Sequence, residues 1–188
     1  MNDLAVRPRR HVTGLSIIVA LAGLGQLFAA ELNIQAPNVV SIDSKLITSG
    51  QPTAAALSEL SALGFGAVIY LAPPSVSDAI PGEADIVRKQ GLEFINIPIA
   101  FNNPTEADFQ SFVAAMERFG DRKVLVHCQV NMRASSMAFL YRVITRHEKA
   151  EVAYESVAKV WSPEGPWKRL LLAQLRKANI ALDRKSVV

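Results

Sequence analysis

The sequence predicts an α/β fold, a three-layer α/β/α sandwich with a mostly parallel central sheet. Short apolar runs alternate along the chain with segments whose apolar residues recur every three or four positions. This alternation is typical of β-α-β units, in which a helix joins two parallel strands. The length of 188 residues suits one domain with a sizeable core.

The elements follow one another in a regular order. Thr53 is an expected N-cap, Gly64 ends the helix that Thr53 starts, and Pro98 marks the end of a strand or an edge strand. The expected strands are 39–42, 46–48, 67–71, 94–99 and 124–126, and the expected helices are 53–63, 82–90, 105–119, 133–146, 148–160 and 166–177.

The stretch around residues 123–136 is where chemistry is expected. His127 and Cys128 follow a buried strand, four residues separate Cys128 from Arg133, and a helix then begins. The N–H groups and dipole of a helix start favour an anion, and loop amides can close around the same spot as a nest. Arg133 adds a planar fork suited to phosphate, and such a field favours the thiolate form of Cys128. Ligands of parallel sheets bind at the carboxyl ends of strands, where Cys128 lies.

This arrangement resembles the cysteine-dependent phosphatases of the protein tyrosine and dual-specificity type, whose signature is His-Cys, five residues, Arg, then Ser or Thr. Here the loop is one residue shorter, and Asn131 stands in the region of the usual glycine. The short loop resembles a bacterial branch of dual-specificity-like phosphatases, related to the domain fused to beta-lactamase-like hydrolases. Segments 46–52, 67–71, 96–99, 103–105 and 160–163 resemble that branch too, so the resemblance covers roughly residues 38 to 175.

The resemblance implies a phosphatase that needs neither cofactor nor metal and forms a phosphocysteine. Cys128 would be the nucleophile, Arg133 would bind phosphate, and the His127 ring would support the loop by hydrogen-bonding nearby backbone. Ser135 would stabilise the departing thiolate, or else is a first-turn helix serine. The remaining phosphate contacts would come from backbone N–H groups of Gln129, Val130, Asn131 and Met132.

The general acid is the gap in this pattern. The family places an aspartate on the loop after the preceding strand, but residues 99–104 hold no carboxylate. Asp108 is the nearest catalytic candidate, although it also fits a capping box with Thr105. Asp78 and Glu83 are remoter candidates.

Two further features have a structural interpretation. Trp161 and Trp167 flank prolines and are expected to be packing anchors for the terminal helices, with substrate stacking as the less favoured alternative. The three histidines of the chain are not paired at metal-ligand spacing, so no metal site is expected.

Residues 1–30 have the layout of a secretory signal peptide. Three arginines between positions 7 and 10 precede an apolar run at 14–28, and Ala29 and Ala30 offer a cleavage point. The alternative is an uncleaved anchor, the only expected contact with a membrane. The domain, residues 31–188, is therefore expected to be exported, either periplasmic or secreted. The net charge of +3 comes without a basic stripe carrying interleaved aromatics, so no nucleic-acid partner is expected.

The predicted function is an exported phosphatase acting on phosphate monoesters, with a phosphorylated substrate of unnamed type as its partner. One alternative is an inactive binding module that holds phosphate or a phosphorylated ligand, which the missing loop aspartate favours. The other is a rhodanese-like sulfurtransferase, which also carries a cysteine between strand and helix, although the position of Arg133 argues against it.

Overall fold

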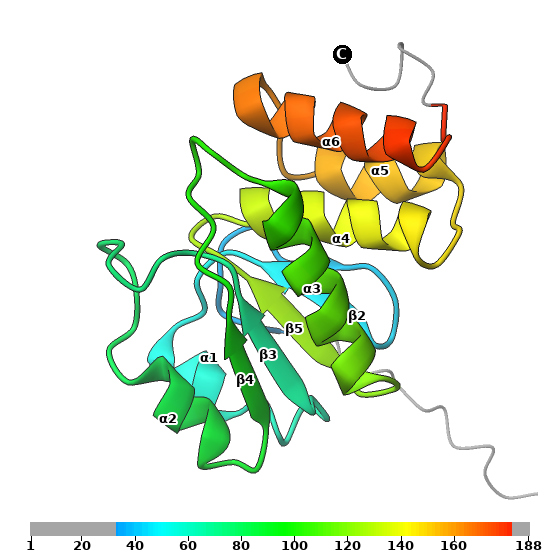
Figure 1. Ribbon diagram of the computed structural model, residues 1–188. Coiled ribbons are helices and arrows are strands. Elements are labelled where there is room, and N and C mark those ends of the chain that lie inside the picture. Colours follow the sequence, from blue (N-terminus) through cyan, green and yellow to red (C-terminus); the bar gives the residue numbers. More distant parts are fainter. Residues whose placement is uncertain (1–32, 182–188) are drawn as a thin grey trace, which may run out of the picture. The chain divides into compact units, whose positions relative to one another are not determined.

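A five-stranded sheet forms the centre of the fold, with strand order β1-β2-β5-β3-β4. The structure is a computed structural model and describes residues 33–181 (Figure 1). Only β1 runs antiparallel, against β2, and every other neighbouring pair is parallel. The strands are β1 (Val40–Ser41), β2 (Leu46–Ser49), β3 (Ala67–Tyr70), β4 (Glu93–Asn96) and β5 (Val124–His127).

Helices cover both faces of this sheet, which confirms the predicted three-layer fold. One buried cluster joins α1 and α2 to one face of the sheet, and a larger cluster joins α3 to α6 to the other (Figure 1). The helices are α1 (Ala54–Ser58), α2 (Glu83–Arg88), α3 (Glu106–Phe119), α4 (Met132–Ile144), α5 (Ala150–Ala158) and α6 (Gly165–Lys177).

The alternation of side chains along β5 decides where the two chemical residues point. Leu125 packs in the cluster with α1 and α2, whereas Val124 and Val126 pack in the cluster with α3 to α6. Successive side chains of a strand face opposite sides of its sheet. His127 accordingly lies on the α2 side, and Cys128 belongs to the α3–α6 cluster.

Several expected elements are shorter than the sequence pattern predicts, the helix after Thr53 and the strand before Pro98 among them. The helix that starts after Thr53 ends at Ser58, because the N–H of Glu59 bonds to the oxygen of Ala56, three positions back, and turns follow. The strand expected at 94–99 ends at Asn96, shortly before Pro98, which has no N–H to donate. The expected leader, residues 1–30, lies outside the described residues. Within residues 33–181, no helix combines the length and apolarity needed to cross a membrane.

Candidate active site

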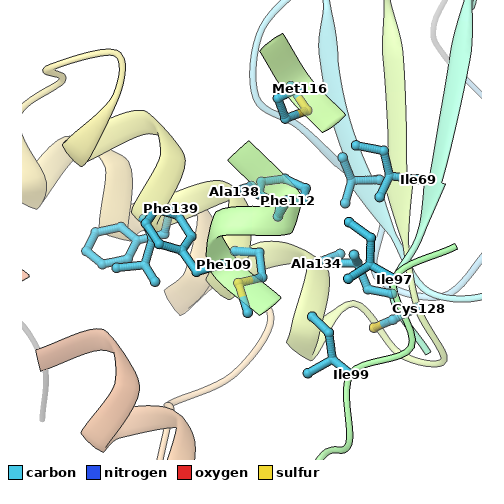
Figure 2. Close-up of a cluster of buried hydrophobic side chains, with 14 of the residues drawn as sticks. Ile69, Ile97, Ile99, Phe109, Phe112, Met116, Cys128, Ala134, Ala138 and Phe139 are labelled. Carbon is cyan, nitrogen blue, oxygen red and sulfur yellow. The ribbon is translucent and has the colours of Figure 1, made fainter. Parts of the chain in front are cut away.

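The loop after β5 carries the expected nucleophile; residues 128–133 are called the cysteine loop from here on. Cys128 is fully buried, and its N–H donates to the oxygen of Ser49, 3.3 Å away. Figure 2 shows Cys128 in the buried apolar cluster that also holds Ile97, Ile99 and Ala134. An apolar base excludes water from one side of the thiol and leaves the loop itself as the side from which an anion can be held.

Arg133 closes the cysteine loop at the start of α4. Its side chain is 5% exposed, and its Nε donates to the oxygen of Ile99 at 3.0 Å. One terminal nitrogen, Nη1, lies 3.4 Å from Oε1 of Gln129, and the guanidinium carbon lies 5.1 Å from the centre of the Phe101 ring. Three contacts therefore fix the position of the guanidinium, a group whose planar fork suits phosphate.

Asn131 takes a left-handed backbone conformation, which glycine adopts most readily. Its φ of 72° is in the left-handed region, which asparagine tolerates better than most residues. Its side-chain Nδ2 also donates to the oxygen of Asn38 at 2.6 Å and to Oγ1 of Thr48 at 3.1 Å. Asn131 thus both makes the left-handed turn and braces the loop.

The back of the cysteine loop is held by the chain around Gly50. The N–H of Gln51 donates to the oxygen of Gln129 at 2.9 Å, and Nδ2 of Asn38 donates to the oxygen of Val130 at 3.1 Å. A Cβ atom at Gly50 would lie 2.7 Å from that Gln129 oxygen, closer than real Cβ atoms approach. These bonds turn two loop carbonyls outward, an arrangement that favours an anion-binding nest of N–H groups on the inner side.

His127 lies in a buried polar cluster on the α2 side. Its Nε2 is 2.6 Å from Oε1 of Glu83, without the angle of a hydrogen bond, and its ring stacks on Tyr70 at 4.8 Å. Glu83 also accepts from Nε2 of Gln51 at 3.0 Å. The prediction that the His127 ring hydrogen-bonds nearby backbone is wrong, because neither ring nitrogen has a hydrogen-bond partner among the described residues.

Tyr70 is part of the same cluster. Burial is the largest cause that raises the pKa of Tyr70 to about 12, and the neighbouring carboxylates of Glu83 and Asp78 raise it further. The phenol is therefore neutral throughout the physiological range, and its O–H points to the oxygen of Pro73, 3.5 Å away.

Two aspartates have clearly different surroundings. Asp108 forms the capping box of α3: its Oδ2 accepts from both the N–H and the hydroxyl of Thr105 at 2.7 Å. Asp78, on the loop between β3 and α2, accepts from Nε2 of Gln129 at 2.9 Å. The capping role predicted for Asp108 is confirmed. The catalytic role of Asp108 remains a prediction, because its carboxyl group is bonded to Thr105. Asp78, in contrast, contacts the cysteine loop through Gln129.

Ser135 bonds within its own helix. Its hydroxyl donates to the oxygen of Met132 at 3.3 Å, as expected for a serine in the first turn. A role in stabilising the thiolate stays a prediction. Across residues 33–181, no three His, Cys, Asp or Glu side chains lie close enough together to hold a metal ion.

The structure thus gathers the predicted residues Cys128 to Arg133 into one loop. Gly50, Asn38 and Phe101 were not predicted to take part, yet each contacts that loop. The glycine in segment 46–52 was a usable signal, since a glycine beside a strand end often allows close backbone approach. Phe101 offered no such signal, because exposed aromatic residues in loops are common.

A family model described as a DSP-PTPase phosphatase fused to NAD+ kinase matches residues 34–168. The chain belongs to this phosphatase family. This family membership agrees with the cysteine loop and with the predicted resemblance to the protein tyrosine and dual-specificity phosphatases.

Related proteins show the same family. A beta-lactamase hydrolase-like protein of Xylella fastidiosa (strain Temecula1) is 31% identical over 116 residues, which are 60% of this chain and 27% of that protein. The chain therefore spans about a quarter of the length of the curated relatives it matches. A crystal structure of a DUF442 protein from Shewanella putrefaciens CN-32, described as a candidate phosphatase, is 31% identical with a TM-score of 0.70, covering 76% of this chain and 91% of its own.

A more distant structure supports the fold alone. PTPMT1, solved in complex with PI(5)P, is 17% identical with a TM-score of 0.65, covering 75% of this chain and 96% of its own. The five-stranded, mostly parallel α/β architecture is therefore that of the cysteine phosphatases.

Proposed function

We propose that this chain hydrolyses phosphate monoesters through a phosphocysteine at Cys128. The observation that carries the proposal is the cysteine loop itself: Cys128 and Arg133 stand at the two ends of a loop that opens α4. The family to which the chain belongs supports the same reaction class.

In the first step the Cys128 thiolate attacks phosphorus, an S–P bond forms, and the P–O bond to the alcohol breaks. Arg133 and the loop N–H groups bind the three other oxygens, whose negative charge is best stabilised in the transition state. The departing oxygen takes up a proton. In the second step water attacks the phosphocysteine, and inorganic phosphate leaves with release of the thiolate.

Asp78 is the proton donor that the contacts of the chain favour. Its carboxyl group bonds to Gln129, the residue directly after Cys128, whereas the carboxyl group of Asp108 is engaged with Thr105. Loss of a general acid typically lowers a rate by about 10² to 10⁴-fold. A donor on the β3–α2 loop would replace the aspartate missing from residues 99–104.

The alternative function is a phosphate-binding module without turnover. It is favoured by the absence of a carboxylate in residues 99–104, together with the complete burial of Cys128. Such a module would need the loop and Arg133 but not the thiolate.

Hydrolysis of a small aryl phosphate, with a metal chelator present, tests the proposal. The wild-type chain, Cys128→Ser and Arg133→Ala are compared, with Arg169→Ala, an exposed arginine on α6, as the matched control. We expect turnover in the wild type and the control, none in Cys128→Ser, and a loss of at least about 10²-fold in Arg133→Ala. No turnover in the wild type, with phosphate still raising its melting temperature, would establish the binding module instead.

Export is a separate proposal. It is supported by the arginines, apolar run and small residues of positions 7–30. Fractionation of cells that produce the chain would test it: recovery of a shortened protein outside the cytoplasm is expected, and a full-length cytoplasmic protein would contradict it.

A further inference from the structure

A pocket lined mostly by apolar side chains, three of them aromatic, opens beside the cysteine loop. It is called the aromatic pocket here, and its volume is about 440 Å³. The lining comes from the loop after β4, the start of α4, the turn between α5 and α6, and the start of α6. Its main side chains are Phe101, Met132, Trp161, Glu164, Pro166 and Trp167.

The pocket shares two residues with the proposed phosphate site. The Phe101 ring lies over the guanidinium of Arg133, 5.1 Å from its carbon to the ring centre, and it is 5.8 Å from the ring of Trp161. Met132 belongs to the cysteine loop and precedes Arg133 directly. The pocket therefore adjoins the loop that would hold the phosphate.

The two tryptophans are held differently. Trp167 is fully buried, and its Nε1 donates to the oxygen of Phe101 at 2.8 Å, so it is the packing anchor that the sequence predicted. Trp161 is only partly buried, and its Nε1 has no hydrogen-bond partner among the described residues. Ring contacts with Phe101 and Trp167, at 5.8 and 6.3 Å, hold Trp161 in place. Its indole ring thus lines the pocket without the hydrogen bond that fixes Trp167.

Size and charge indicate what the pocket accepts. A cavity of about 150 Å³ is enough for benzene, so about 440 Å³ exceeds the need of one phenyl ring. The volume is also within the range of small-molecule sites. Among the lining residues, Glu164 is the one ionisable side chain, and its negative charge disfavours a second anionic group.

We propose that the aromatic pocket binds the organic group of the phosphate monoester, and that this group is a neutral apolar ring system larger than one phenyl ring. The inference rests on the proposed phosphate site for the position of the ester. Flat rings stacked or packed edge-on against Phe101 and Trp161 supply the affinity, and Arg133 supplies the phosphate contact.

Binding to the Cys128→Ser chain tests the inference without depending on turnover. Calorimetry compares three probes: inorganic phosphate, phenyl phosphate with one ring, and 4-methylumbelliferyl phosphate with two fused rings. Each is measured with Trp161 intact, with Trp161→Ala and with Trp161→Phe. The matched control is Val152→Ala, an exposed apolar residue on α5 outside the pocket.

We expect the two-ring ester to bind more tightly than phenyl phosphate. Trp161→Ala should weaken the two-ring ester about tenfold and leave inorganic phosphate within about twofold, since one aromatic contact is worth about that much. Trp161→Phe should keep most of the preference for the two-ring ester over phenyl phosphate. This variant keeps a ring in the pocket, so it keeps the test valid if Trp161→Ala folds poorly. Val152→Ala should leave the binding of all three probes unchanged.

Other outcomes overturn the inference in distinguishable ways. If all three probes bind but neither Trp161 variant alters the preference, the pocket is not the ester site and the proposed phosphatase stands. If the two-ring ester binds no better than phenyl phosphate, the size argument is wrong. If inorganic phosphate itself fails to bind, the proposed function fails and this inference falls with it.

Discussion

The carboxyl group of Asp78 accepts a hydrogen bond from the side chain of Gln129, 2.9 Å away, although 51 positions separate them in the chain. The other end of the same amide lies 3.4 Å from Nη1 of Arg133. Gln129 thus links the loop between β3 and α2 to both ends of the cysteine loop, and it holds the carboxyl group of Asp78 beside that loop.

Asp78→Asn should slow hydrolysis in proportion to how much the leaving group needs a proton. The amide keeps an acceptor for Gln129 but cannot supply that proton. We expect a loss of about 10²-fold or more with alkyl phosphates and a much smaller loss with a nitrophenyl phosphate. Steady-state kinetics with both esters measures this, and an equal loss with both would show that Asp78 only positions the loop.

Asp108→Ala should affect stability instead of turnover. The change removes the acceptor of two bonds from Thr105 at the start of α3. We expect a loss of about 1 kcal/mol in the free energy of unfolding and turnover within about twofold of wild type. Urea unfolding and kinetics on one preparation test both. A large loss of turnover on alkyl phosphates alone would instead make Asp108 the proton donor.

Asn131→Ala should be more damaging than Asn131→Gly. Both lose the bonds to Asn38 and Thr48, but only alanine also pays about 1–2 kcal/mol for the left-handed backbone. We expect the glycine variant to retain more stability and tighter binding of inorganic phosphate. Urea unfolding and calorimetry measure these, and equal behaviour of the two variants would mean that the side-chain bonds alone matter.

Gly50→Ala should displace the cysteine loop. The added Cβ would meet the backbone oxygen of Gln129 at 2.7 Å, and backbone cannot move aside as a flexible side chain can. We expect turnover to fall by about tenfold or more, because small misplacements of catalytic groups are costly. Ser44→Ala, at an exposed turn position, is the control. Wild-type turnover in Gly50→Ala would show that the loop tolerates the shift.

Tyr70→Phe should change how stability depends on pH in alkaline solution. The pKa of Tyr70 is about 12 in the folded chain against 10.0 ordinarily, so above pH 10 the unfolded chain loses the phenol proton first. Wild-type stability should therefore fall between pH 10 and 12, by no more than about 3 kcal/mol from this group. Phenylalanine should flatten that fall. Urea unfolding across this range tests it, and parallel curves for the two proteins would contradict the assignment.

Much of the site could be predicted from sequence because its parts are local. Cys128, Arg133 and the residues between them belong to one strand–loop–helix unit, and the capping box of Asp108 joins residues three positions apart. Helix and strand positions followed from periodicity, with errors at ends such as Ser58 and Asn96, where hydrogen bonding and not apolar spacing decides.

The sequence by itself determined the α/β class, the cysteine loop and the kind of chemistry proposed for this loop, because all of these depend on spacing along the chain. Only the tertiary structure decided which distant groups meet the loop: Asp78 on Gln129, Gly50 against its backbone, and Phe101 over Arg133. These contacts depend on how strands β2, β3 and β4 are ordered beside β5 and on how their following loops pack together, and no spacing within one segment encodes that order.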